Sequence, residues 1–104
     1  MSSEKDFIEY LIFMNKFVVL WEILKYSPES WENYSITEDK ITKSCVLKDK
    51  NGNVVTDDDV FDDMVEIKLS KKGKEFYERY LSGEFFKESE IPDIIRSGLV
   101  YFYL

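Results

Sequence analysis

Apolar residues dominate the N-terminal segment, residues 5–26, which contains neither proline nor glycine. Apolar residues recur with helical spacing at positions 7, 11, 14, 18 and 21. This spacing predicts one long helix. Further apolar residues lie on its other sides. We therefore expect the helix either to occupy the centre of the core or to bury a second face against another copy in a homodimer.

Polar residues interrupt this segment too often for it to cross a membrane. Asn15, Lys16, Glu22 and Lys25 leave no uninterrupted apolar run of about 20 residues. The opening residues, MSSEKDFIEYL, lack the cationic start of a secretory signal. The sequence thus predicts a protein that makes no contact with a membrane.

Strand patterns appear in the middle of the chain. Asn51 and Gly52 lie between the apolar pairs 46–47 and 54–55. They predict a β-hairpin, because both residues accept the positive φ of a tight turn. In residues 65–69, VEIKL, apolar and charged residues alternate, which predicts a strand with one buried face.

Three further helices are predicted from capping residues and proline. Ser35 or Thr37 is placed to cap a short helix within SITEDKITK. Ser70 is placed to cap a helix over residues 71–81, and Pro92 suits the start of another short helix.

The predicted fold is a single α+β domain spanning residues 1–104. We expect the long N-terminal helix to pack with a small antiparallel sheet of three or four strands and with the helix near residues 71–81. The apolar C-terminal run, residues 99–104, suits a strand of that sheet or a segment packed on the long helix.

One segment resembles a known family. In VEIKLSKKGKEFYERYL, the residues Leu69, Ser70, Gly73 and Phe76 occupy the places typical of the wing strand and following helix of winged-helix regulators. The resemblance covers residues 65–81 and implies a degenerate winged-helix arrangement. It also implies an alternative function, a DNA-binding transcriptional regulator. In that function the phosphate-binding residues would be Lys71, Lys72 and Lys74.

The composition of the chain limits the functions that it can have. The chain of 104 residues carries a formal charge of −7, which repels the phosphate backbone of nucleic acids and suits a basic protein partner. Cys45 is the sole cysteine, so an intrachain disulfide is excluded and a reducing, cytoplasmic compartment is expected. The chain has no histidine, so it has neither a Ser-His nor a Cys-His catalytic pair. We expect neither enzyme activity nor a cofactor.

Residues 49–60, DKNGNVVTDDDV, resemble a calcium-binding loop only in part. Val54 stands where an EF-hand needs glycine, and Val60 stands where it needs a bidentate glutamate. We therefore predict no metal site.

Aspartates crowd the segment that follows the hairpin. Residues 57–63 contain no lysine or arginine. They include Phe61 and the aspartates Asp57, Asp58, Asp59, Asp62 and Asp63. The segment is either a solvated acidic loop with Phe61 in the core or a docking surface on which the aspartates steer a basic partner and Phe61 anchors it.

The second alternative leads to our functional hypothesis. We expect a non-enzymatic binding protein that inhibits or neutralises a basic partner, such as a nuclease or another nucleic-acid-binding protein. Small acidic proteins that lack catalytic residues in this way include toxin-immunity proteins and phage or viral antagonists.

Overall fold

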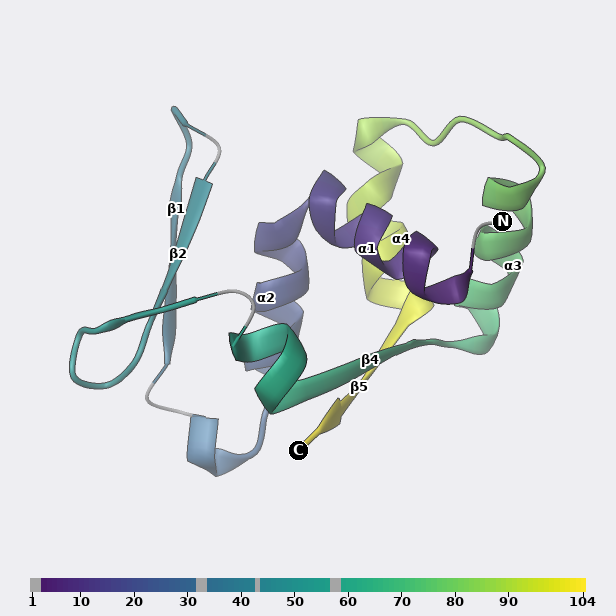
Figure 1. The fold of residues 1–104 in the computed structure, drawn as a ribbon. Helices are drawn as coiled ribbons and strands as arrows, with labels where there is room; N and C mark the ends of the chain where they lie inside the picture. Colours follow the sequence, from purple (N-terminus) through teal and green to yellow (C-terminus); the bar gives the residue numbers. More distant parts are fainter. Residues whose placement is uncertain (1–2, 32–33, 43, 57–58) are drawn as a thin grey trace.

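The computed structural model describes residues 3–31, 34–42, 44–56 and 59–104. Its helices are α1 (Glu4–Met14), α2 (Lys16–Lys25), α3 (Lys71–Leu81) and α4 (Ile91–Gly98). Its strands are β1 (Ser35–Asp39), β2 (Ser44–Lys48), β3 (Val54–Val55), β4 (Val65–Leu69) and β5 (Leu99–Tyr103). Single helical turns are η1 (Glu29–Trp31), η2 (Asp59–Met64) and η3 (Glu88–Glu90). The predicted α+β class is confirmed (Figure 1).

The predicted long N-terminal helix is in fact two helices, α1 and α2, which meet at Asn15. Asn15 has φ −155° and ψ 74°, outside the helical region. Its Oδ1 accepts a hydrogen bond from the Val18 N–H at 3.2 Å and so caps α2. The single-helix prediction was wrong because apolar residues continue with helical spacing on both sides of the break. No helix in the described ranges is long and apolar enough to span a membrane.

Strands β1, β2 and β3 form an antiparallel sheet in that order. The predicted hairpin is confirmed: Leu47 pairs with Val55, and Gly52 adopts φ 81° in the turn. The helix predicted within SITEDKITK is wrong, because residues 35–39 form β1. This strand puts Ile36 opposite Leu47, next to the core.

The C-terminal run forms β5, which pairs antiparallel with β4 as a second, two-stranded sheet. Val65 and Leu99 are buried on its inner face, whereas Glu66 and Lys68 are exposed on the outer face. The strands therefore form two small sheets, and Figure 1 shows the β1–β2 hairpin on the far side of α2 from α3.

Helices α3 and α4 pack closely where two glycines face one another. A Cβ atom placed on Gly73 would lie 2.0 Å from the Gly98 carbonyl oxygen. Ser70 fastens the same corner: its hydroxyl accepts from the Gly73 N–H at 3.0 Å and donates to the Ser97 carbonyl oxygen at 2.8 Å. The predicted Ser70 cap of α3 is thus confirmed.

One apolar core includes or contacts residues from every helix α1–α4 and every strand β1–β5. It includes Phe7 and Leu11 of α1, Ile23 of α2, Leu47 of β2 and Ile95 of α4, each almost completely buried. Burial of apolar surface contributes about 25 cal/mol per Å² to stability, and it is the main stabilising contribution of such a core.

The winged-helix resemblance holds only over its own segment. Residues 65–81 form a strand and a capped helix, as the resemblance implies. A winged-helix protein also needs a pair of helices, including a recognition helix, before that strand. Here β1, β2 and β3 occupy that part of the chain, so the predicted degenerate winged-helix arrangement was wrong.

Candidate functional site

From Asp59 to Met64, the acidic segment forms a helical turn, η2, directly before β4. The Thr56 hydroxyl accepts from the Asp59 N–H at 3.3 Å and fixes the start of the turn. Val60 is buried, Phe61 and Met64 are half-buried, and Asp59, Asp62 and Asp63 are exposed. This division follows from helical spacing, since positions 60, 61 and 64 share one face of a turn.

The sequence analysis left two alternatives for Phe61, burial in the core or contact with a partner. Val60 is 1% exposed and anchors the turn in the core. Phe61 is half-buried and lines a surface groove, so part of its ring surface is open to a ligand. Asp57 and Asp58 lie outside the described residues.

The groove runs between α1 and β4 and has a volume of about 800 Å³. Its apolar wall includes Ile8 and Ile12 from α1, Phe61 from η2 and Ile67 from β4. Grooves of this size that combine an apolar wall with a few charged groups are typical of binding sites. Sequence reasoning missed the α1 residues because the groove exists only once α1 packs beside β4.

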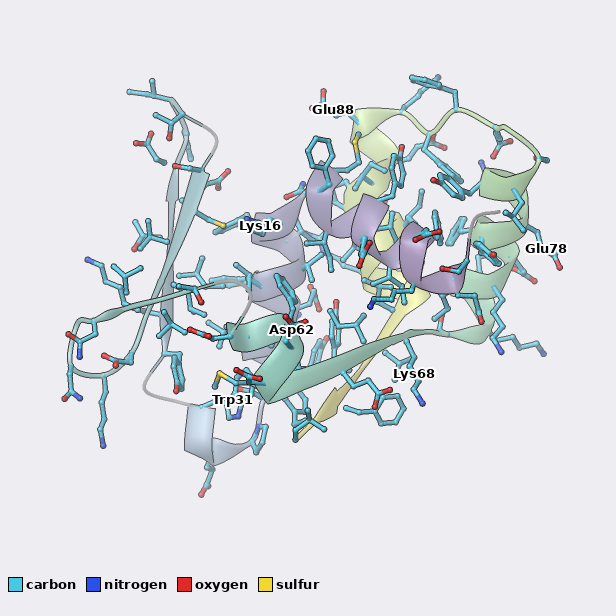
Figure 2. All side chains as sticks on the ribbon, in the orientation of Figure 1. Lys16, Trp31, Asp62, Lys68, Glu78 and Glu88 are labelled. Carbon is cyan, nitrogen blue, oxygen red and sulfur yellow. The ribbon has the colours of Figure 1, made fainter. Side chains whose placement is uncertain are left out.

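Charged residues border the groove unevenly. The lining carboxylates are Glu4, Glu9, Asp62 and Glu66, and the lining amines are Lys5, Lys68 and Lys74. In Figures 1 and 2, Asp62 lies on η2 at one end of β4, whereas α3, which carries Lys74, follows the other end. The η2 end of the groove is thus mainly acidic, and the α3 end is mainly basic.

The three lysines of the alternative site lie in the first turns of α3 and are exposed. Lys72 lies 3.6 Å from the Glu75 carboxylate and 5.7 Å from the centre of the Phe76 ring. Lys74 lines the groove, whereas Lys71 does not. The structure therefore does not gather the three lysines into one pocket, and an exposed pair such as Lys72–Glu75 contributes little to stability.

The residues weighed for calcium have structural roles in the hairpin. Asp49 Oδ1 accepts from the Asn51 N–H at 2.8 Å and from the Asn53 N–H at 3.0 Å, which holds the turn closed. Among the described residues, no cluster of three or more His, Cys, Asp or Glu side chains could hold a metal ion. Cys45 is half-buried on β2.

A buried polar cluster lies apart from the groove lining, between α2, α4 and β5. Glu22 is 5% exposed, and its Oε1 lies 3.5 Å from Nε of Arg96. Burial, and secondarily the charge of Glu22, raises the pKa of Tyr101 and of Tyr103. Both phenols are therefore neutral at physiological pH.

Comparison with known proteins found no match to this chain among protein-family models, curated proteins or solved structures. The geometry of the groove and its charges are therefore the observations that bear on function.

Proposed function

We propose that this protein is a non-enzymatic binding module that holds a basic partner protein in the groove between α1 and β4. The observation that carries the proposal is the pairing of an open apolar wall, which includes Phe61, with exposed carboxylates at one end of the groove. Binding energy at protein interfaces comes mainly from a few apolar or aromatic anchors, and surrounding charges guide association.

The charge of the chain indicates the kind of partner. A formal charge of −7 attracts basic surfaces over a distance set by the ionic strength. Proteins that act on nucleic acids carry such basic surfaces, because those surfaces neutralise phosphates. A nuclease or another nucleic-acid-binding protein, inhibited in the manner of an immunity protein or a phage or viral antagonist, is the partner that we propose. A cytoplasmic setting is part of the same proposal.

The test begins with capture of partners from host cells, followed by kinetics with the purified captured protein. We expect Asp62→Asn combined with Asp63→Asn to lower the association rate about tenfold at low salt, because these carboxylates attract the partner as it approaches. Phe61→Ala is expected to raise the dissociation rate, because it removes apolar contact area. The association rate of the wild type should fall as salt rises.

A matched control variant tests whether the loss of two negative charges anywhere on the protein has the same effect on association. Glu78 and Glu88 are exposed and lie away from Asp62, as the labels in Figure 2 show. The variant that combines Glu78→Gln with Glu88→Gln loses the same two charges and should bind nearly as fast as the wild type. Equal effects of the two variants would refute a local docking surface.

DNA binding is the competing function, and a gel shift at low salt separates the two. We expect no shift on any duplex, because the described residues place strands where a recognition helix would be required. A shift that Lys71→Ala, Lys72→Ala and Lys74→Ala together abolish would favour the regulator instead.

A further inference from the structure

Two hydrogen bonds that flank the β4–β5 ladder show which backbone groups of β4 point toward β5 and which point away from it. The Leu104 N–H donates to the Met64 carbonyl oxygen at 3.1 Å, and the Ser70 N–H donates to the Gly98 carbonyl oxygen at 2.9 Å. Hydrogen-bonded pairs alternate with non-bonded pairs in antiparallel strands. The even-numbered residues of β4 therefore bond to β5, and the odd-numbered residues direct their N–H and C=O groups to the opposite edge.

That opposite edge borders the groove. The groove lining includes every residue from 65 to 69, both those that face the core and those that face solvent, and no residue of β5. Since both faces of β4 contribute, the groove opens along the edge of the strand. At its centre, the Ile67 N–H and C=O face away from β5 and have no backbone partner among the described residues. An edge of this kind is a template for another strand.

The charges around this edge are arranged about Ile67 in a self-complementary way. Residues 62–72 read DDMVEIKLSKK, and acidic residues on one side of Ile67 match lysines at equal distance on the other. The matched pairs are Glu66 with Lys68, Asp63 with Lys71 and Asp62 with Lys72. An antiparallel copy of the same segment would therefore meet opposite charges throughout.

We propose that β4 pairs antiparallel with β4 of a second copy, with Ile67 opposite Ile67 across a two-fold axis. The two β4–β5 ribbons then form one four-stranded sheet, and the outward backbone groups of Ile67 bond to each other. Each Glu66 lies opposite Lys68 of the other copy, and such cross-strand opposite charges are favourable. The acidic η2 of one copy approaches the basic first turn of α3 in the other.

The charges also select the register of this pairing. Only shifts by two residues keep the outward backbone groups in line. A shift by two in one direction puts Glu66 opposite Glu66, and a shift in the other direction puts Lys68 opposite Lys68. Both shifts replace attraction by repulsion. The free edge of β5 offers no comparable selection, because residues 99–103 carry no charge.

This inference does not depend on the proposed function, because self-association is measured on the purified chain alone. The second copy and a basic partner would compete for the same groove. Partner binding is therefore expected to weaken as the concentration of this protein rises into the range where it dimerises.

The test reverses charges that are exposed in the single chain. Glu66→Lys and Lys68→Glu each replace two attractive pairs per dimer by two repulsive ones. We expect each variant to weaken the dimer at least tenfold in sedimentation equilibrium. An equimolar mixture of the two variants should form a mixed dimer about as tight as the wild type, because every cross-strand pair between positions 66 and 68 then joins a lysine to a glutamate. The double variant should also recover wild-type self-association.

The intrachain Glu66–Lys68 pair spans 3.6 Å at the surface, so its loss has little effect on folding. Glu78→Lys, a matched charge reversal on the exposed side of α3, should leave dimerisation unchanged. A wild type that remains monomeric at several hundred micromolar would overturn the proposal. So would single variants that dimerise as well as the wild type, or a mixture of the two that forms no dimer.

Discussion

Two tyrosines of β5 have hydroxyl groups in contrasting surroundings. The Tyr103 hydroxyl donates to the Ile23 carbonyl oxygen at 2.6 Å, which ties β5 to α2. The Tyr101 hydroxyl is buried and has no hydrogen-bond partner within the described residues. A buried polar group without a partner costs about 1–3 kcal/mol, whereas a made hydrogen bond contributes about 1 kcal/mol.

The two tyrosines therefore give a matched pair of variants with opposite expectations. Tyr103→Phe should lower the free energy of unfolding by about 1 kcal/mol, because it removes the bond to Ile23. Tyr101→Phe should leave it unchanged or raise it, because it removes an unpaired hydroxyl. Urea unfolding at pH 7 measures both. A larger loss for Tyr101→Phe than for Tyr103→Phe would contradict the structure.

The same tyrosines make the stability of the folded protein depend on pH. Burial, with a smaller contribution from Glu22, raises the pKa of Tyr101 above its unfolded value, which is about 10. The folded chain therefore holds the phenolic proton more tightly than the unfolded chain does. This contribution to stability is complete below pH 10 and is lost as pH rises beyond it. Urea midpoints measured from pH 8 to pH 11 should fall above pH 10, and they should fall less in Tyr101→Phe.

Among single residues, the acidic segment was predictable only in part. The exposure of Asp59, Asp62 and Asp63 follows from their charge, and the structure bears this out. The sequence did not indicate that Val60, and not Phe61, is the residue buried in the core. That choice depends on the direction in which η2 enters β4, which is a property of the packed structure.

At the scale of elements, the contact between α3 and α4 depends on the absence of side chains. A Cβ on Gly73 would overlap the Gly98 carbonyl oxygen, whereas a Cβ on Gly98 would lie 3.3 Å from the Gly73 Cα. The first overlap involves backbone and cannot be relieved by a rotamer change. The helices would have to move apart, and overpacking of this kind typically costs about 1–3 kcal/mol, occasionally more.

We therefore expect Gly73→Ala to destabilise the protein by about 3 kcal/mol and Gly98→Ala to destabilise it by about 1 kcal/mol. Lys74→Ala, at an exposed position one residue from Gly73, should change stability by less than about 0.5 kcal/mol. Thermal unfolding followed by circular dichroism ranks the three variants. A Gly73→Ala variant as stable as Lys74→Ala would show that the two helices do not meet here.

Element types were predictable where local signals agreed. Ser70 before residues 71–81, the Asn51-Gly52 turn and the alternation in residues 65–69 all led to correct elements. Two predictions failed for physical reasons. Asn15 interrupts a helical pattern that continues beyond it, and residues 35–39 form a strand because pairing with β2 outweighs the local capping signal.

For the whole molecule, the main feature is the separation of charge along the segment from η2 to α3. The sequence shows the acidic tract and the lysines, but it does not show that the strand between them has an open edge. That edge depends on β5, which comes from the end of the chain and pairs with the other side of β4. The groove and its open edge therefore require the complete fold.

We propose that this protein binds other proteins in the groove beside β4, and the exchange of single amide protons of that strand with solvent can show whether it does. The Ile67 N–H faces away from β5, whereas the Lys68 N–H bonds to β5, so the two amides of one strand form a matched pair. In the free monomer we expect Ile67 to exchange much faster than Lys68. When the captured partner binds, exchange at Ile67 should slow at least tenfold while Lys68 changes little. Exchange at Ile67 that stays fast in a saturated complex would contradict the account.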